Sequence, residues 1–368
     1  MRRRWLAFFV LLGLLALSGV YAWSERHAIF VWHYARQLGT PDAAERARLA
    51  EHLAVWEPLA WARLVRQLES ADADLCHGSM EVMLTWLRRR SANDPKSEQI
   101  ASVLVERWDR LSSSGQGEAS RLVRECQAAA PPTRAGAWQT LVVRLLQKAD
   151  GQAPEPALPH LLHVGWLTTQ QPFSESLLPT LRRLAVTGLG SPAPATRVLA
   201  VRLASHHALH AQDQVSALLK GPTLDPAPEV RAIAILSLGA AEGVLPTDDL
   251  LPFLHDADAE VRLLAEQALR SRGLGPLHLQ LGKQMLHPDV ACRAQVPSQV
   301  LEMPELDANL WLQRLSQDPA PAVRAAVARA VAEAGEPALR PWLEKLAESD
   351  PSPTVQQLAR YYLRSTAN

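Results

Sequence analysis

The stretch that decides the fold is residues 318–332, which read DPAPAVRAAVARAVA. A turn residue followed by a proline and an apolar run is typical of the start of a helix. Within the run, Val323, Val327 and Val331 recur at helical spacing, and Ala330 falls on the same face. The stretch therefore predicts a helix that presents a face of small apolar side chains to a neighbouring element.

The same pattern recurs along the second half of the chain, so the sequence contains internal repeats. Each copy carries an arginine, or in the last copy a glutamine, at one register position: Arg197, Arg231, Arg262, Arg293, Arg324 and Gln356. These positions are 34, 31, 31, 31 and 32 residues apart. An acid stands a few residues before each later arginine: Asp225, both Asp256 and Asp258, Asp289 and Asp318. We expect the ladder to use Asp225, Asp258, Asp289 and Asp318. Because arginine binds carboxylates in bidentate geometry, we expect these residues to form a structural ladder between repeats.

The recurring segments resemble the HEAT-repeat family, in particular its short-period bacterial, lyase-type repeats with the pattern D-x-x-P-x-V-R-x-x-A-x-x-A-L. The resemblance covers residues 191–368. It implies an all-α fold, an α-solenoid in which antiparallel helix pairs of about 31 residues stack into a superhelix. We expect divergent, Trp-rich repeats with bulky core side chains in residues 24–150 and a degenerate, Pro-containing repeat in residues 151–190. The segment SSSGQG, residues 112–117, predicts a loop.

The N-terminus carries the pattern of a membrane anchor. After the tip MRRR, residues 1–4, residues 5–23 contain no charge. As a helix this segment is about 28 Å long, close to the ~30 Å thickness of the bilayer core. Three arginines before it predict a cytoplasmic N-terminus, so we expect a single-pass protein of the bacterial inner membrane with residues 24–368 exported. The alternative is a signal peptide that is cleaved after Ala22, which would release a soluble repeat protein.

Composition excludes several function classes. Acidic and basic side chains balance at 38 each and the sequence pI is 7.2, which argues against nucleic-acid binding. Arginine outnumbers lysine 33 to 5, as in proteins from GC-rich bacterial genomes. The three cysteines, Cys76, Cys126 and Cys292, are far apart and lack the spacing of a zinc site or a disulfide framework. We expect no cofactor and no small-molecule substrate.

One histidine cluster has the character of a metal site. His206 and His210 are four residues apart, so on a helix they would share a face, and His207 stands between them. An exported, metal-dependent or lyase-like enzyme with its site among these histidines is therefore the alternative function. The sequence contains no His-Glu dipeptide, unlike the di-iron hydroxylases of HEAT-like architecture, and we favour a polar helix end that faces solvent.

These observations together predict a non-catalytic, membrane-anchored scaffold that binds another protein. In the resembled family the second helix of each pair lines the concave face. By helical spacing this implies a partner-binding face made of Leu263, Glu266, Arg270, Arg329 and Glu333. The mixed charges of this face predict a salt-sensitive protein contact and not a track for phosphates.

Overall fold

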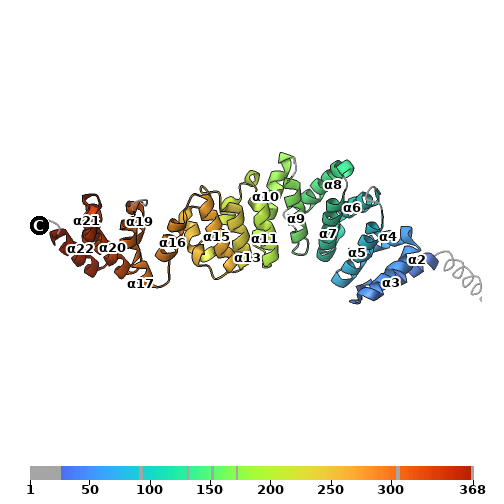
Figure 1. The fold of residues 1–368 in the computed structure, drawn as a ribbon. Helices are drawn as coiled ribbons and strands as arrows, with labels where there is room; N and C mark the ends of the chain where they lie inside the picture. Colours follow the sequence, from blue (N-terminus) through green and yellow to red (C-terminus); the bar gives the residue numbers. More distant parts are fainter. Residues whose placement is uncertain are drawn as a thin grey trace, which may run out of the picture. The chain divides into compact units, whose positions relative to one another are not determined.

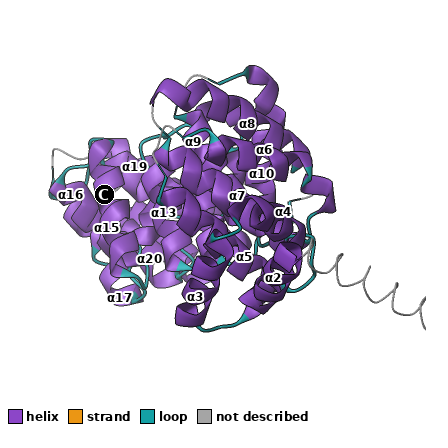
Figure 2. Cartoon of the chain, turned by 90° about the vertical axis from the view of Figure 1, so that its right-hand side faces the viewer, coloured by secondary structure: helices purple, strands orange, loops and turns teal. Residues whose placement is uncertain are grey.

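The computed structural model of the protein describes six ranges of the chain, residues 26–90, 94–130, 132–150, 153–170, 173–303 and 307–365. Every regular element in these ranges is a helix, as Figure 2 shows. The predicted cytoplasmic tip and membrane span, residues 1–4 and 5–23, lie outside them. Among the helices that are described, none has the length and apolar character needed to cross a membrane.

The chain divides into two compact units, residues 1–215 and 216–368, and each is described by itself. The helices of the N-terminal unit are α2 (Arg26–Arg36), α3 (Ala43–Ala54), α4 (Glu57–Gln67), α5 (Ala73–Arg88), α6 (Lys96–Glu106), α7 (Ser113–Ala129), α8 (Ala135–Lys148), α9 (Leu158–Thr169), α10 (Leu178–Leu189) and α11 (Pro194–Ala204). Helix α12 (Gln212–Ala217) contains the boundary.

The C-terminal unit continues with shorter helices. They are α13 (Pro228–Leu238), α14 (Thr247–Leu250), α15 (Ala259–Ser271), α16 (Pro276–Met285), α17 (Val290–Arg293), α18 (Val296–Leu301), α19 (Ala308–Leu315), α20 (Pro321–Ala334), α21 (Arg340–Ser349) and α22 (Pro353–Ser365). Short 3₁₀ turns occur in both units, at Gln37–Gly39 (η1), Trp108–Arg110 (η2), Pro132–Arg134 (η3), Glu175–Leu177 (η4), His207–Leu209 (η5), Gly221–Thr223 (η6), Leu251–His255 (η7) and Pro337–Leu339 (η8).

The helices are packed as repeated pairs (Figure 1). In the N-terminal unit α4 packs on α5, α6 on α7, α8 on α9 and α10 on α11. The second helices of these pairs stack on one another, α5 on α7, α7 on α9 and α9 on α11. In the C-terminal unit α13 packs on α15 and α20 on α22 in the same way. The prediction of an all-α fold built from repeated helix pairs is confirmed, and this stacking within each unit is that of an α-solenoid.

Local sequence accounts for most helix starts. Aspartate or serine side chains accept a backbone amide of the first turn and so cap the helix, at Asp42, Asp72, Ser112, Asp258, Asp289 and Asp307. Proline opens other helices, where its missing N–H costs nothing, at Pro194, Pro228, Pro276, Pro321 and Pro353.

The loop that was predicted at residues 112–117 is wrong. Ser112 Oγ accepts the amide of Gly115 at 3.1 Å, so this polar segment is the capped first turn of α7. The prediction failed because serine and glycine are as typical of a helix start as of a loop.

The glycine in this turn is needed for close helix packing. A Cβ at Gly115 would lie 1.9 Å from the carbonyl oxygen of Leu68, which follows α4. Gly78 in α5 has the same relation to the carbonyl oxygen of Leu38, also at 1.9 Å. The second helices of two successive pairs therefore contact an earlier backbone at positions where no side chain fits.

The second helix of one pair in the C-terminal unit is broken. The segment VACRAQVPSQVL forms the two short helices α17 and α18. Pro297 lies in the first turn of α18, where it is tolerated. In one continuous helix it would lack a hydrogen bond and its ring would clash with the carbonyl group one turn earlier, so the helix breaks before it. The repeat is therefore retained in this segment, but as two helices that meet near Ala294.

The tryptophans of the predicted Trp-rich repeats are mostly core residues. Trp61, Trp86, Trp108 and Trp138 are buried. Trp61 and Trp86 meet edge to face with ring centroids 5.3 Å apart. Trp32 and Trp56 are exceptions, since Trp32 is 44% exposed and Trp56 is only half-buried and stacks on the exposed ring of Phe30.

We predict that Gly115→Ala destabilises the N-terminal unit by about 2 kcal/mol or more, because a backbone carbonyl cannot move aside as a side chain can. Gly136→Ala in α8 is the matched control, since a Cβ there would meet nothing within 4 Å. That variant should keep its stability or gain up to about 1 kcal/mol from helix propensity. Denaturant unfolding followed by circular dichroism measures both, and equal stability of the two variants would contradict the close approach.

Candidate functional site

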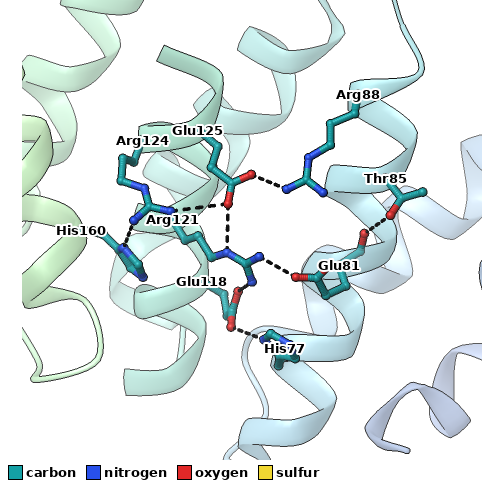
Figure 3. Close-up of polar contacts among 9 residues, drawn as sticks. All are labelled: His77, Glu81, Thr85, Arg88, Glu118, Arg121, Arg124, Glu125 and His160. Atoms are coloured by element: carbon teal, nitrogen blue, oxygen red, sulfur yellow. Dashed lines mark hydrogen bonds and ion pairs between the residues drawn. The ribbon is translucent and has the colours of Figure 1, made fainter. Parts of the chain in front are cut away.

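The N-terminal unit contains a cluster of paired charges that spans three stacked helices (Figure 3). We call it the charged cluster and define it by the side chains of α5, α7 and α9 that take part: His77, Glu81, Arg88, Glu118, Arg121, Arg124, Glu125 and His160. Three carboxylates face three guanidinium groups, so the cluster is close to neutral. A neutral cluster does not attract phosphates as a basic groove would.

Arg121 of α7 is the centre of the cluster. Its Nη2 donates to Glu81 of α5 at 2.5 Å, and its Nε donates to Glu125 at 3.0 Å. Its Nη1 lies 3.3 Å from Glu118. Burial lowers the pKa of Arg121, but the hydrogen bonds and charges of these three carboxylates outweigh burial and raise it. Arg121 therefore fastens α7 to α5 and has no proton to give.

Glu125 extends the cluster toward solvent. It accepts a hydrogen bond from Arg88 of α5 at 2.6 Å, and the Arg88 side chain is 56% exposed. Burial raises the pKa of Glu125, but Arg88 and Arg121 together outweigh burial and lower it. This carboxylate is ionised at neutral pH and fully paired, which makes it a poor general acid or base.

His160 of α9 closes the cluster on the third helix. Arg124 Nη1 lies 3.1 Å from His160 Nδ1, so the neutral ring accepts this hydrogen bond. Burial, and then the positive charge of Arg124, lower the pKa of His160 to about 4. The ring therefore stays neutral at pH 7 and acts as an acceptor that ties α9 to α7.

A cavity of about 320 Å³ lies beside the charged cluster and shares Arg88 and Glu125 with it. The rest of its lining is mainly apolar and comes from the ends of α5 and α7 and the starts of α6 and α8: Leu84, Leu87, Arg90, Ser97, Cys126, Ala129, Ala130 and Trp138. This volume is at the lower end of the range for ligand pockets. The cavity can take one aromatic or aliphatic side chain, with paired charges at its edge.

The cavity contains no activated nucleophile among its described residues. Burial raises the pKa of Cys126 to about 12, and the charge of Glu125 adds to this. A thiol with this pKa is not ionised at neutral pH, so it is not an activated nucleophile.

The arginine ladder is present in the C-terminal unit, with Asp318 as predicted and with Asp256 and Asp350 as further acids. Arg231 of α13 holds Asp256 with two hydrogen bonds, of 2.9 and 2.7 Å. Arg293 holds Asp318 in the same way, and Arg324 of α20 holds Asp350 at 2.8 and 3.0 Å. Each aspartate stands in the loop before the next second helix, so each pair fastens one repeat to the following one.

Each ladder arginine also closes its own loop. Nη1 donates to the two carbonyl oxygens six and five residues earlier, as in the bonds from Arg324 to Asp318 and Pro319 at 2.7 and 3.2 Å. In the N-terminal unit Arg197 makes the same pair of bonds, to Ser191 and Pro192. Gln356 of the last repeat makes one of them, to Asp350.

The assignment of Asp258 and Asp289 to the ladder is wrong. Both are helix caps, at the starts of α15 and α17. The ladder position is six residues before the arginine, and Asp258 and Asp289 stand four before it. Asp225 and Asp318 do stand at the ladder position, and each also accepts the backbone amide two residues later.

Arg262 shows what the ladder needs. Six residues before Arg293, where the other repeats of the C-terminal unit have aspartate, this chain has His287. Arg262 therefore bonds to the carbonyl oxygens of Asp256 and Ala257, and no ion pair to it is found among the described residues. Nδ1 of His287 accepts a hydrogen bond from the backbone amide of Asp289 at 3.0 Å. In those other repeats the aspartate accepts the equivalent amide, so His287 replaces that hydrogen bond but not the ion pair. Asp256 and Asp350 stand at this six-residue position, before Arg262 and Gln356.

The histidine cluster does not form one helical face. Helix α11 ends at Ala204, His206 is extended, and His210 is left-handed with φ 48°. His206 and His207 stack with ring centroids 4.6 Å apart. Burial, and then His207, lower the pKa of His206. Within the described ranges no three His, Cys, Asp or Glu side chains are grouped to hold a metal ion.

The predicted partner-binding residues lie on α15 and α20. Leu263 and Arg270 are exposed, as are Arg329 and Glu333. Glu266 is half-buried and paired with Arg270 at 2.5 Å and with Lys283 of α16 at 2.8 Å. The hydrogen bond from Lys283 is the main cause that lowers the pKa of Glu266.

Sequence reasoning missed the charged cluster and the cavity. The signal for the cluster was the spacing of Glu118, Arg121 and Glu125, which puts alternating charges on one face of α7. Their partners on α5 and α9 could not be read from the sequence, because they are about 40 residues away and the pairing depends on how the helices stack.

We predict that Arg324→Ala destabilises the last two helix pairs by about 3–5 kcal/mol, because it leaves the buried Asp350 carboxylate, 1% exposed, without its partner. Arg262→Ala is the matched control and should cost no more than ~2 kcal/mol, since only two hydrogen bonds to carbonyl groups are lost. Hydrogen exchange of residues 321–365 measures the first loss. Equal losses of stability in both variants would show that the ion pair with Asp350 does not stabilise the fold.

A second prediction concerns pH. The pKa of His160 is about 4 in the folded protein and about 6.5 in the unfolded chain, so both states are neutral above pH 6.5. As pH falls from 6.5 to 4 the unfolded chain takes up the proton first, and the folded state loses stability. His160→Asn keeps an acceptor for Arg124 and should lose less stability than the wild type between pH 7 and pH 4.5. The midpoints of denaturant unfolding at both pH values measure the two losses of stability. If the wild type and His160→Asn lose the same stability between pH 7 and pH 4.5, the prediction is contradicted.

Comparison with known proteins agrees with the repeats of the C-terminal unit. No curated protein matches the chain. Among solved structures, an engineered protein from the Northeast Structural Genomics Consortium is 17% identical, with a TM-score of 0.38, and the match covers 92% of this chain and 99% of that chain. The family model of HEAT repeats matches residues 280–365. These residues include α17 to α22 and the ion pairs Arg293–Asp318 and Arg324–Asp350. The prediction of HEAT repeats is therefore confirmed here: residues 280–365 are HEAT repeats.

Proposed function

We propose that this protein is a non-catalytic scaffold that binds another protein through its helical repeats. Stacked helix pairs offer long side-chain surfaces, which suit contacts with a macromolecule better than the enclosure of a small substrate. The HEAT repeats of residues 280–365 support this class of function. The paired state of the charged cluster and the high pKa of Cys126 agree with a role in binding.

The observation that carries the proposal is the cavity beside the charged cluster. Protein interfaces combine a buried apolar anchor with a polar rim. Here Leu84, Leu87 and Trp138 supply an apolar floor, and the Arg88–Glu125 pair supplies a charged edge. We propose that an aromatic or aliphatic side chain of the partner enters this cavity while its polar groups meet Arg88.

The uncharged segment at residues 5–23 supports an anchored location for this scaffold. We propose that it spans the bacterial inner membrane once, with Arg2, Arg3 and Arg4 in the cytoplasm and the repeats on the other side. In this arrangement the scaffold would collect its partner at the membrane surface.

The face on α15 and α20 remains a second proposed contact. It offers the exposed Leu263 among the mixed charges of Glu266, Arg270, Arg329 and Glu333. Because Glu266 already pairs with Arg270 and Lys283, a partner must compete with existing ion pairs there. The cavity has no such competitor for an apolar side chain, so we place the main anchor in the cavity.

We predict that Ala129→Trp, which fills the cavity from within, lowers the amount of captured partner by roughly tenfold or more, as expected for loss of a central anchor. Ala128→Trp is the matched control, because Ala128 is exposed like Ala129 but is not part of the cavity lining. The full chain is affinity-purified from detergent-solubilised membranes, and co-purifying proteins are quantified by mass spectrometry.

Two results would count against this assignment. If Ala129→Trp folds and captures the same protein at the wild-type level, the cavity is not the anchor. If reversal of Glu266, Arg270, Arg329 and Glu333 abolishes capture while Ala129→Trp does not, the partner binds the face on α15 and α20.

A further inference from the structure

The first helices of the N-terminal unit expose an unusual amount of apolar surface. Five large hydrophobic side chains within residues 29–59 are exposed: Ile29 51%, Phe30 46%, Trp32 44%, Val55 73% and Leu59 51%. They come from α2, from the end of α3 and from α4 (Figure 1). Single exposed hydrophobic residues are ordinary, but a group of five on adjoining helices needs an occupant.

The group forms one surface. The Phe30 ring stacks on Trp56 with centroids 5.7 Å apart and planes within 9°. Val55 and Leu59 flank Trp56 in the sequence. Ile29 and Trp32 are three residues apart and so continue the surface along α2. We call these residues the α2 face and define it as Ile29, Phe30, Trp32, Val55, Trp56 and Leu59.

The packing of α2 on the core keeps the α2 face exposed. Val31 and Ala35 are buried on the opposite side of α2, where the helix packs on α3 and α4. Helix α2 therefore cannot turn its exposed side inward without uncovering these two residues. The apolar surface is a fixed feature of the folded unit.

The position of α2 in the chain limits what can cover it. The proposed membrane span ends at Trp23, and α2 begins at Arg26. Three residues of chain reach at most about 11 Å. The headgroup layer on each side of the bilayer core is about 5–8 Å thick. If the span crosses the membrane, the start of α2 is therefore held within or beside the headgroup layer.

The chemistry of α2 also fits that layer. Tryptophan and phenylalanine favour the membrane interface, where the ring is half in apolar surroundings. The helix carries Arg26 and Arg36 and no acidic residue. The Arg36 guanidinium lies over the Trp32 ring, 5.5 Å from its centroid. An aromatic surface edged by arginine is suited to a bilayer that contains anionic lipids.

We propose that the α2 face lies on the outer surface of the bilayer, with its aromatic side chains among the lipid headgroups. This inference rests on the proposed membrane anchor and adds to it a second contact that fixes the orientation of the first repeats. A second copy of the chain and a different protein are the competing occupants, and the experiment separates them from lipid.

The experiment places a photoreactive benzoylphenylalanine at Phe30 in the full chain, reconstituted in vesicles of phosphatidylethanolamine and phosphatidylglycerol. A second variant carries it at Trp32, in case the first disturbs the stack on Trp56. The matched control carries it at Tyr361, an aromatic residue of α22 that is 64% exposed. After illumination, mass spectrometry of tryptic peptides measures phospholipid adducts. Resistance to carbonate extraction is measured on the same vesicles as a test of the anchor.

We expect lipid adducts on the peptide of residues 27–36 in both test variants, at a yield roughly tenfold or more above the control. A chain that resists carbonate but gives no adduct at either position would overturn the inference and leave the anchor intact. Cross-linked dimers in place of lipid adducts would overturn it in favour of a second copy. A chain that carbonate extracts would overturn both the anchor and the inference. A chain that resists carbonate, gives no lipid adduct and forms a cross-link to another protein only when membrane extract is added would overturn the inference in favour of a different protein.

Discussion

Each helix pair of this chain has an apolar face that only the next pair can cover, and the structure of each unit depends on that constraint. The second helices α5, α7 and α9 stack in order, as do α20 and α22. Stacking this close requires small residues or none at the contacts, which is why Gly78 and Gly115 face backbone carbonyl groups. A repeat that loses its neighbour loses its core, so stability is shared between adjacent pairs.

Polar fastening between the pairs takes two forms. In the C-terminal unit it is periodic, since Arg231, Arg293 and Arg324 each reach the aspartate of the next loop. Arg262, for which the next loop has His287 instead, bonds to carbonyl groups and to no acid among the described residues. Burial raises the pKa of Asp350, but hydrogen bonds from Arg324 and the Ser352 amide outweigh burial and lower it. In the N-terminal unit the fastening combines the cluster around Arg121 with separate ion pairs between other helices, such as Arg107–Glu69 and Arg134–Glu98. A periodic ladder needs a repeated motif, whereas a local cluster needs only three helices whose charges match.

The proposed binding role rests on the cavity between the stacked helices and on the charged side chains beside it. The helix ends around Ala129 and Trp138 leave a cavity that the core does not fill. The neighbouring charges are already paired, so they define an edge for an incoming partner without creating a reactive group. At the start of the same unit, α2 leaves its aromatic surface uncovered close to the proposed membrane span. The proposed binding site and the proposed membrane contact thus both use surface that the packing of the repeats leaves free.

The sequence by itself determined the class of fold and much of its period. The recurrence around Arg231, Arg262 and Arg324 identified the repeats, because helix starts and apolar spacing are local properties of the chain. It also showed that arginines would bind acids. It did not show which acids, since Asp256 and Asp258 are equally close in sequence and only the loop geometry puts Asp256 in front of Arg231.

Tertiary structure alone decided the rest. Ser112 begins a helix because its cap meets Gly115, and that glycine is required by the backbone after α4. His206 and His210 do not share a helical face because α11 ends before them. The charged cluster joins residues of α5, α7 and α9 that are about 40 positions apart along the chain. Local rules act over one or two helical turns, while contacts between side chains of different repeats depend on the distance and rotation at which whole helices pack.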